Sequence, residues 1–178
     1  MTLLSYSGEK WGEVGKSGVR TPNQRLNVRI MIGGVNVVSL DSKGRLAIPA
    51  RHRETLLSSF GSKLVVTLEA RDHLLLYPEP NWRPVEARLL ALPAGNPMLK
   101  RYQKLVLGHA ELLDMDSAGR ILLSPRLRGL VSLDKDVALV GMGNRFELWD
   151  AADWDAQTSD ALDIDPAELS QHLGDFTL

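Results

Sequence analysis

The sequence has no cysteine among its 178 residues. Disulfides, thiolate metal sites and a cysteine nucleophile are therefore excluded, and the composition fits a reducing cytosol. Hydrophobic runs are short, and none approaches the roughly 18 residues that a membrane-spanning helix needs. These absences predict a cytoplasmic protein that has no membrane helix and needs no disulfide to fold.

Basic residues are absent from the end of the chain. No Lys or Arg follows Arg145, whereas nine Asp and Glu residues do. Residues 1–53 show the opposite bias, with nine Lys and Arg against three acids. The net charge of −1 conceals this asymmetry. A basic front and an acidic back predict that one end of the protein meets a polyanion.

The sequence contains an internal repeat. Residues 41–53, DSKGRLAIPARHR, recur at 116–128 as DSAGRILLSPRLR, with Asp, Ser, Gly and three Arg in matching positions. Further on, Leu74–Tyr77 corresponds to Phe146–Trp149, and each of these segments is followed by a tryptophan, Trp82 or Trp154. We interpret the chain as two copies of a unit of about 50 residues, each too small to bury a core alone.

Local patterns predict the same elements in both copies. β-branched runs around turn residues predict strands over 35–40, 45–48, 63–68 and 73–77, and again over 110–115, 120–123, 137–140 and 145–149. Helical spacing and capping residues predict helices over 50–57, 81–91, 97–107 and 165–174. We therefore divide the chain into a disordered or mis-annotated extension (1–30), a first unit (31–80), a helical linker (81–109), a second unit (110–154) and an acidic tail or helix (155–178).

These motifs resemble the MraZ family of bacterial transcriptional regulators. The resemblance rests on the two Asp-x-x-Gly-Arg segments, on Leu107-Gly108-His109-Ala110 before the second and on Phe146-Glu147-Leu148-Trp149 after it, and it covers about residues 31–178. It implies an α+β, β-rich fold in which two AbrB-like (SpoVT-AbrB) swapped-hairpin units form an intramolecular pseudo-dimer. It also implies a ring homo-oligomer, an octamer or dodecamer, associated with the nucleoid. That ring would bind repeated GTG-rich boxes upstream of the division and cell-wall gene cluster and repress its own operon.

The resemblance places the family's DNA-contacting residues at Lys43 and Arg45. From the residues themselves, Asp41 either pins a tight turn through an ion pair or holds Arg45 rigid for a guanine edge or a phosphate. Lys43 is either a phosphate contact or a solvated turn lysine. Because Ala118 replaces this lysine in the second copy, we expect Asp116, Gly119 and Arg120 to be structural, like Asp41 and Gly44.

Two further arginines, Arg51 and Arg53, lie at the start of the first predicted helix, and we expect them to contact phosphates. Other functions have weaker support. No nucleophile–base pair and no metal-ligand spacing is visible, and Gly15-Lys16-Ser17 lacks the rest of a phosphate loop. The sequence therefore predicts no enzyme, cofactor or metal site. A ring-forming scaffold that does not bind DNA remains the alternative.

Overall fold

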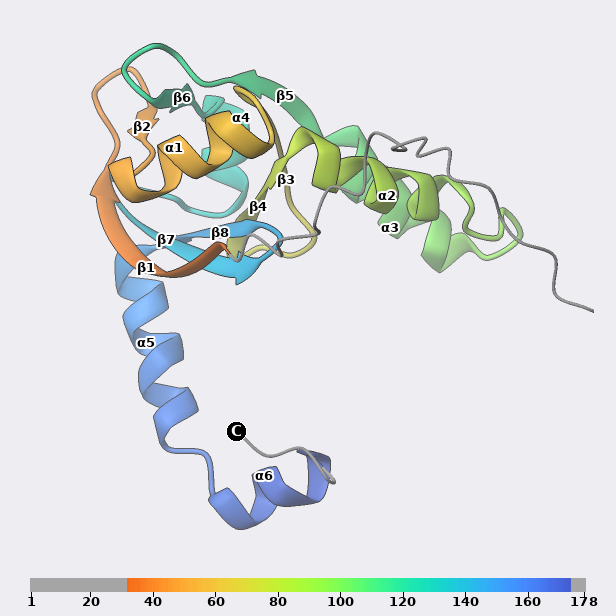
Figure 1. Ribbon diagram of the computed structural model, residues 1–178. Helices are drawn as coiled ribbons and strands as arrows, with labels where there is room; N and C mark the ends of the chain where they lie inside the picture. The colour runs from red at the N-terminus through yellow and green to blue at the C-terminus, as the bar shows by residue number, and fades with distance from the viewer. Residues whose placement is uncertain (1–31, 174–178) are drawn as a thin grey trace, which may run out of the picture.

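The computed structural model describes residues 32–173, so the expectation for residues 1–30 lies outside the described part (Figure 1). The first half contains strands β1 (Ile32–Ser39), β2 (Arg45–Ala47), β3 (Lys63–Thr67) and β4 (His73–Pro78). The second half contains β5 (Glu111–Asp114), β6 (Arg120–Leu122), β7 (Asp136–Gly143) and β8 (Phe146–Asp150). The helices are α1 (Ala50–Ser59), α2 (Glu79–Leu90), α3 (Pro97–Gly108), α4 (Pro125–Leu130), α5 (Ala151–Leu162) and α6 (Pro166–Leu173).

Strands from the two repeats alternate in space. Within residues 32–173, one antiparallel sheet has the order β1-β7-β8-β4-β3-β5, and a separate two-stranded ribbon pairs β2 with β6. The first strand of each repeat thus pairs with the third strand of the other, β1 with β7 and β5 with β3. The second strands pair with each other, as do the fourth strands, β4 with β8. This exchange confirms the predicted fold, a pseudo-dimer of swapped hairpins.

The central core lies between the ribbon, the sheet and helices α1 and α4. It combines corresponding residues of the two repeats, such as Leu46 with Ile121 and Leu56 with Val131, all at most 1% exposed. Alternation along β2 and β6 buries Leu46 and Ile121 and turns their neighbours outward. Neither repeat encloses this core without the other, which is the physical reason for the strand exchange.

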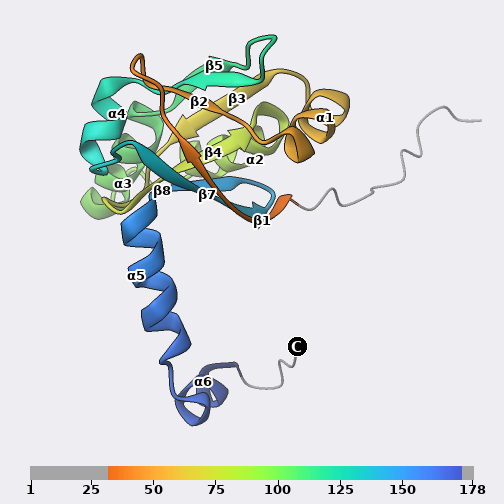
Figure 2. The same cartoon turned by 90° about the vertical axis from the view of Figure 1, so that its left-hand side faces the viewer.

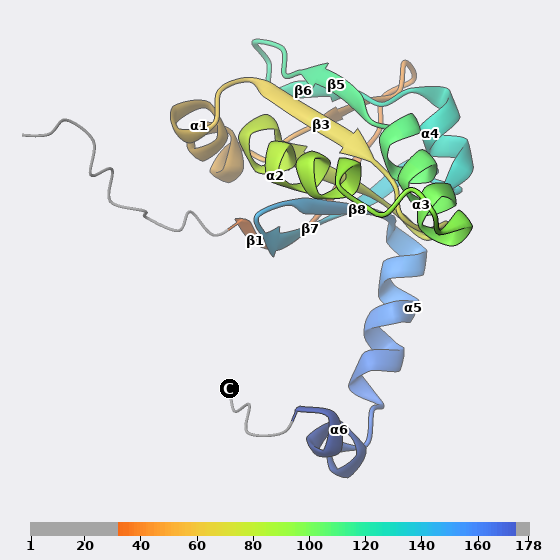
Figure 3. The ribbon, with the colours of Figure 1, turned by 90° about the vertical axis from the view of Figure 1, so that its right-hand side faces the viewer.

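The outer faces of the sheet are covered unequally. On the first half, α2 and α3 pack together over β3 and β4 and bury Trp82 and Leu89. On the outer face of the second half, α5 packs against β7 and β8, and Trp154 is only half-buried. Figures 2 and 3 show α5 and α6 projecting from the body as an arm. Within the described residues 32–173, the position that α3 occupies in the first half therefore has no equivalent helix in the second.

Strand β7 ends at Gly143 rather than at the predicted Val140, and two further elements also differ from the sequence prediction. Strand β1 begins at Ile32 rather than Val35, although Gly33 and Gly34 disfavour a strand by propensity, and its backbone there packs closely against Gly141 of β7. A Cβ added at Gly141 would lie 2.6 Å from the Cα of Gly33. Helix α5 was missed, because its largely polar surface gives a weak helical pattern. The correspondence of Trp154 with Trp82, which lies in a helix, was the available signal.

Among residues 32–173, no helix combines the length and the apolar composition needed to cross a membrane.

Candidate nucleic-acid interface

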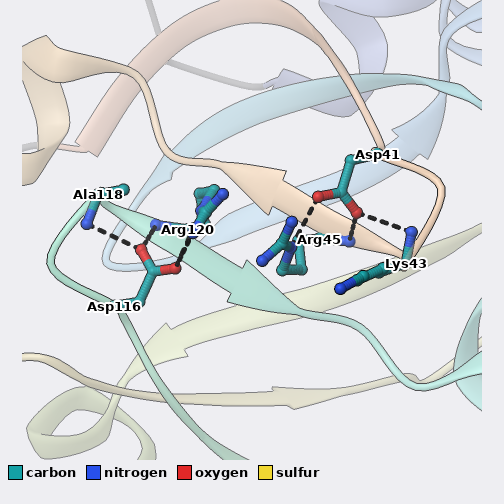
Figure 4. A network of polar contacts seen from close by, with 6 residues as sticks. All are labelled: Asp41, Lys43, Arg45, Asp116, Ala118 and Arg120. Carbon is teal, nitrogen blue, oxygen red and sulfur yellow. Dashed lines mark hydrogen bonds and ion pairs between the residues drawn. The ribbon is translucent and has the colours of Figure 1, made fainter.

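The loop between β1 and β2, which we call the first corner (residues 41–44), is organised by Asp41. Its Oδ1 accepts hydrogen bonds from the backbone N–H groups of Lys43 and Arg45, both at 2.9 Å. Its Oδ2 accepts a hydrogen bond from Nε of Arg45 at 2.6 Å. Figure 4 shows this fork together with the equivalent fork in the second repeat. One carboxylate thus fixes both the turn and the guanidinium beside it.

The loop between β5 and β6, the second corner (residues 116–119), repeats this geometry. Asp116 accepts from the backbone of Ala118 and Arg120, both at 2.9 Å, and from Nε of Arg120 at 2.9 Å (Figure 4). Here Nη2 of Arg120 also lies 2.8 Å from the same carboxylate. Within residues 32–173, neither Nη atom of Arg45 has a hydrogen-bonding partner. The first corner therefore leaves more donors of its arginine available to a ligand.

Both corner carboxylates are held in the ionised form. The hydrogen bond from the backbone N–H of Arg45 is the main reason that the pKa of Asp41 falls from 3.8 to about 2. The backbone of Arg120 likewise lowers the pKa of Asp116. Each Asp–Arg pair is therefore a charged pair at neutral pH, and Lys43 adds an exposed positive charge at the first corner alone.

A glycine closes each corner and is covered by an arginine of the opposite repeat. Gly44 and Gly119 have φ angles of 80° and 74°, which favour glycine. The guanidinium of Arg128 lies over Gly44, and the side chain of Arg53 lies over Gly119. Nε of Arg53 donates to the carbonyl of Ile48 at 2.5 Å. This structural use of Arg53 and Arg128 was not visible in the sequence, because it depends on the strand exchange.

The remaining predicted site residue, Arg51, lies at the start of α1 and is exposed. Its Nε is 3.1 Å from Nε2 of His52, and its Nη2 lies 3.5 Å from the carbonyl oxygen of Val35. Burial of His52, followed by the charge of Arg51, lowers the pKa of that histidine. His52 is therefore neutral at pH 7 and leaves Arg51 as the local cation.

The ribbon joins the two corners into one surface. Backbone bonds from Ile48 to Gly119 (2.9 Å) and from Leu123 to Gly44 (3.0 Å) tie the end of each strand to the opposite turn. In Figures 2 and 3, both corner loops rise at the end of the molecule opposite the α5–α6 arm. The corners with their cations and the acidic arm thus occupy opposite ends of the described part of the chain.

A two-repeat chain with exchanged strands and paired Asp–Arg corners is a swapped-hairpin protein of the AbrB-like class. The family model described as "MraZ protein, putative antitoxin-like" matches residues 31–103 and 106–175. The chain therefore belongs to the MraZ family, as its motifs indicated.

Similar curated proteins carry the name transcriptional regulator MraZ. The one from Chromobacterium violaceum is 81% identical over 148 residues, which are 83% of this chain and all of that protein. That of Thiobacillus denitrificans is 48% identical over the same shares. That of Neisseria meningitidis serogroup C is 49% identical, over 83% of this chain and 99% of that protein.

Among residues 32–173, no group of three or more His, Cys, Asp or Glu side chains is arranged to hold a metal ion.

Proposed function

We propose that this protein is a sequence-specific DNA-binding transcriptional regulator rather than an enzyme. It acts in the cytoplasm at the nucleoid and binds repeated boxes upstream of the division and cell-wall gene cluster as a ring, repressing its own operon. The observation that carries the proposal is the first corner, where exposed Lys43 stands beside a clamped Arg45 on a projecting turn. The names of the similar proteins support the same function.

The chemistry of the first corner suits duplex DNA. Asp41 holds Nε of Arg45, so the guanidinium needs little further ordering before its two Nη groups donate to O6 and N7 of a guanine. Lys43, a mobile point charge at the turn, suits a phosphate. In this proposal Arg51 adds a phosphate contact from α1. Arg53 also adds positive charge toward phosphates, although its Nε is already bound to Ile48.

The test is a binding titration on a DNA fragment from upstream of this gene. We expect Lys43→Ala and Arg45→Ala to abolish or greatly weaken binding, with Arg45→Ala also relaxing discrimination between fragments. The matched control is Arg71→Ala, which removes an exposed charge from the β3–β4 turn on the α5 side of the body (Figure 3). Sedimentation of each variant then separates loss of DNA contact from loss of assembly. Wild-type protein that assembles but ignores the fragment at low salt would favour the scaffold alternative.

The unequal covering of the sheet supports the proposal that subunits assemble into a ring. On the second half, an apolar groove lined by Met142, Trp149, Trp154 and Leu162 lies beside α5 where α3 has no counterpart. The α5–α6 arm beside the groove has no Lys or Arg. It carries six exposed acidic residues: Asp153, Asp155, Asp160, Asp163, Asp165 and Glu168. The α2–α3 pair presents exposed Leu90 and Met98 beside exposed basic residues: Lys100, Arg101 and Lys104. We propose that this pair of one subunit covers the α5 groove of the next, a head-to-tail contact that closes into a ring.

Charge reversal tests this contact. Lys100→Glu with Lys104→Glu is expected to break the assembly, as is Asp160→Lys with Asp163→Lys, and mixing the two variants is expected to restore a limited oligomer. Sedimentation velocity measures each species, and Lys63→Glu, at the start of β3, serves as the control. Unchanged oligomers in both double variants would contradict the contact. Repression is tested separately, since a reporter driven by the upstream region should dim when the protein is overproduced.

A further inference from the structure

The outward face of the β2–β6 ribbon contains side chains that the proposed function has not used. Register pairs Arg45 with Leu122, Leu46 with Ile121 and Ala47 with Arg120. Leu46 and Ile121 are buried against the core, at 0% and 1% exposure. Directly opposed residues of an antiparallel pair point to the same side, so the other four side chains form the outward face. Arg45 and Leu122 therefore form one end of this face, and Ala47 and Arg120 form the other, so that Leu122 has an arginine both across the ribbon and along its own strand.

Leu122 is the exposed apolar side chain of this face. It is 54% exposed, whereas Ala47, its counterpart in the first repeat, is half-buried and contributes only a methyl group. Its Cα lies roughly 5 Å from that of Arg45 across the ribbon. Because Asp41 holds Nε of Arg45, the guanidinium is drawn toward the corner and leaves the leucine uncovered. Leu122, which is uncovered and adjacent to both Arg45 and Arg120, can therefore contact an apolar group on an otherwise polar ligand.

We propose that Leu122 contacts the 5-methyl group of a thymine in the major groove, which makes it a specificity-determining residue. The inference rests on the proposed function and extends it to the second repeat. The major groove accepts a two-stranded ribbon, and there thymine presents an apolar methyl beside its O4 acceptor. Bases stack about 3.4 Å apart, so side chains roughly 5 Å apart reach neighbouring base pairs. Arg45 and Leu122 together then read a guanine next to a thymine.

Arg120 takes a different part in this reading. Two of its nitrogens lie within 3 Å of the Asp116 carboxylate, at 2.9 and 2.8 Å. That pairing leaves it fewer donors than Arg45, and no lysine stands beside it, because residue 118 is alanine. In this proposal the second repeat therefore supplies the apolar contact, through Leu122, while the first repeat supplies most of the hydrogen bonds and the positive charge.

The experiment crosses a protein change with a DNA change. The upstream fragment is synthesised once with thymine and once with uracil throughout, which removes every 5-methyl group and leaves the hydrogen-bonding edges intact. Affinity is measured for the wild type, for Leu122→Ala and for Leu112→Ala. The last is the matched control, because Leu112 is 56% exposed on strand β5 but lies away from the ribbon face, beside Trp82.

We expect the wild type to bind the uracil fragment more weakly, by about fourfold for each contacted methyl, the equivalent of ~0.8 kcal/mol. Leu122→Ala should bind the thymine fragment with a similar loss and show little further loss on uracil, whereas Leu112→Ala should behave as the wild type. An equal uracil penalty for the wild type and Leu122→Ala would overturn the inference, as would no penalty for the wild type. A change of oligomeric state in Leu122→Ala would also overturn it, by assigning the leucine to a subunit contact. Failure of the wild type to bind thymine DNA would instead refute the proposed function.

Discussion

The packing of Arg53 over Gly119 gives a stability prediction whose size follows from the structure. A Cβ at Gly119 would lie 2.7 Å from Cζ of Arg53 and closer still to its Cδ and Nε. The φ angle of 74° adds a backbone cost for any residue with a Cβ. Gly119→Ala therefore carries two penalties, a conformational one and the displacement of Arg53 from the carbonyl of Ile48.

A second glycine separates the two penalties. Gly61 has a φ angle of 83°, but a Cβ there would meet nothing within 4 Å. Gly61→Ala should thus lose only the conformational part, about 1–2 kcal/mol of unfolding free energy. Gly119→Ala should lose about 2–4 kcal/mol, because a hydrogen bond from a half-buried guanidinium adds roughly 1–2 kcal/mol once solvent screening is allowed for.

Urea unfolding followed by tryptophan fluorescence measures these losses, at one fixed chain concentration because assembly contributes to stability. In a background of Arg53→Ala, the cost of Gly119→Ala should fall to that of Gly61→Ala, since the displaced side chain is already gone. Equal losses for Gly61→Ala and Gly119→Ala, or full additivity of Gly119→Ala with Arg53→Ala, would refute the contact between the two repeats.

Three further predictions test the corners and the sheet. The pKa of Asp41 is lowered from 3.8 to about 2, so its stabilisation of the turn is complete above pH 3.8 and is lost as the pH falls through about 2. NMR titration of the Asp41 carboxyl group should give a midpoint of about 2, and a midpoint near 4 would contradict the hydrogen bonds that this carboxylate accepts. Binding to the upstream fragment should weaken steeply as the salt concentration rises. Lys43→Ala should make the negative slope of log affinity against log salt concentration less steep by about 0.9, and an unchanged slope would exclude Lys43 as a phosphate contact. Trp82→Ala should lower the free energy of unfolding by about 3–5 kcal/mol, because Trp82 is 4% exposed. Trp154→Ala should lower the unfolding free energy of the isolated chain less and weaken the oligomer more. Chemical unfolding measures the first effect and sedimentation the second, and the reverse order would contradict the proposed subunit contact.

The sequence indicated the fold well, because the signals for swapped hairpins are local and repeated. Asp followed by Gly and Arg predicts a tight turn in each repeat. After the short strand that follows this turn, Pro49 or Pro125 predicts the start of a helix. Helix α5 was missed because its packing against the sheet is limited to a few residues around Trp154. A short apolar contact on an acidic helix leaves little periodicity to detect.

The candidate site was predictable in part. The link between Asp41 and Arg45 is an i,i+4 relation across a turn, so sequence alone suggested it, and the ion pair is present at 2.6 Å. The roles of Lys43, Arg45, Arg51 and Arg53 toward DNA stay predictions. The cover of Gly119 by Arg53 joins residues 66 positions apart, and no local pattern reports a contact of that range.

By itself, the sequence determined the two units, their turns, the clamped arginines and the separation of basic and acidic ends. These properties depend on residues within a few positions of each other and on composition. Only the tertiary structure decided that β2 pairs with β6, and hence that Arg45, Leu122, Ala47 and Arg120 share one outward face. It also decided that, among the residues that the structure describes, α5 has no neighbour equivalent to α3. Both outcomes result from strand exchange, in which each repeat completes its core with strands of the other, and such pairing depends on how the whole chain buries its apolar surface.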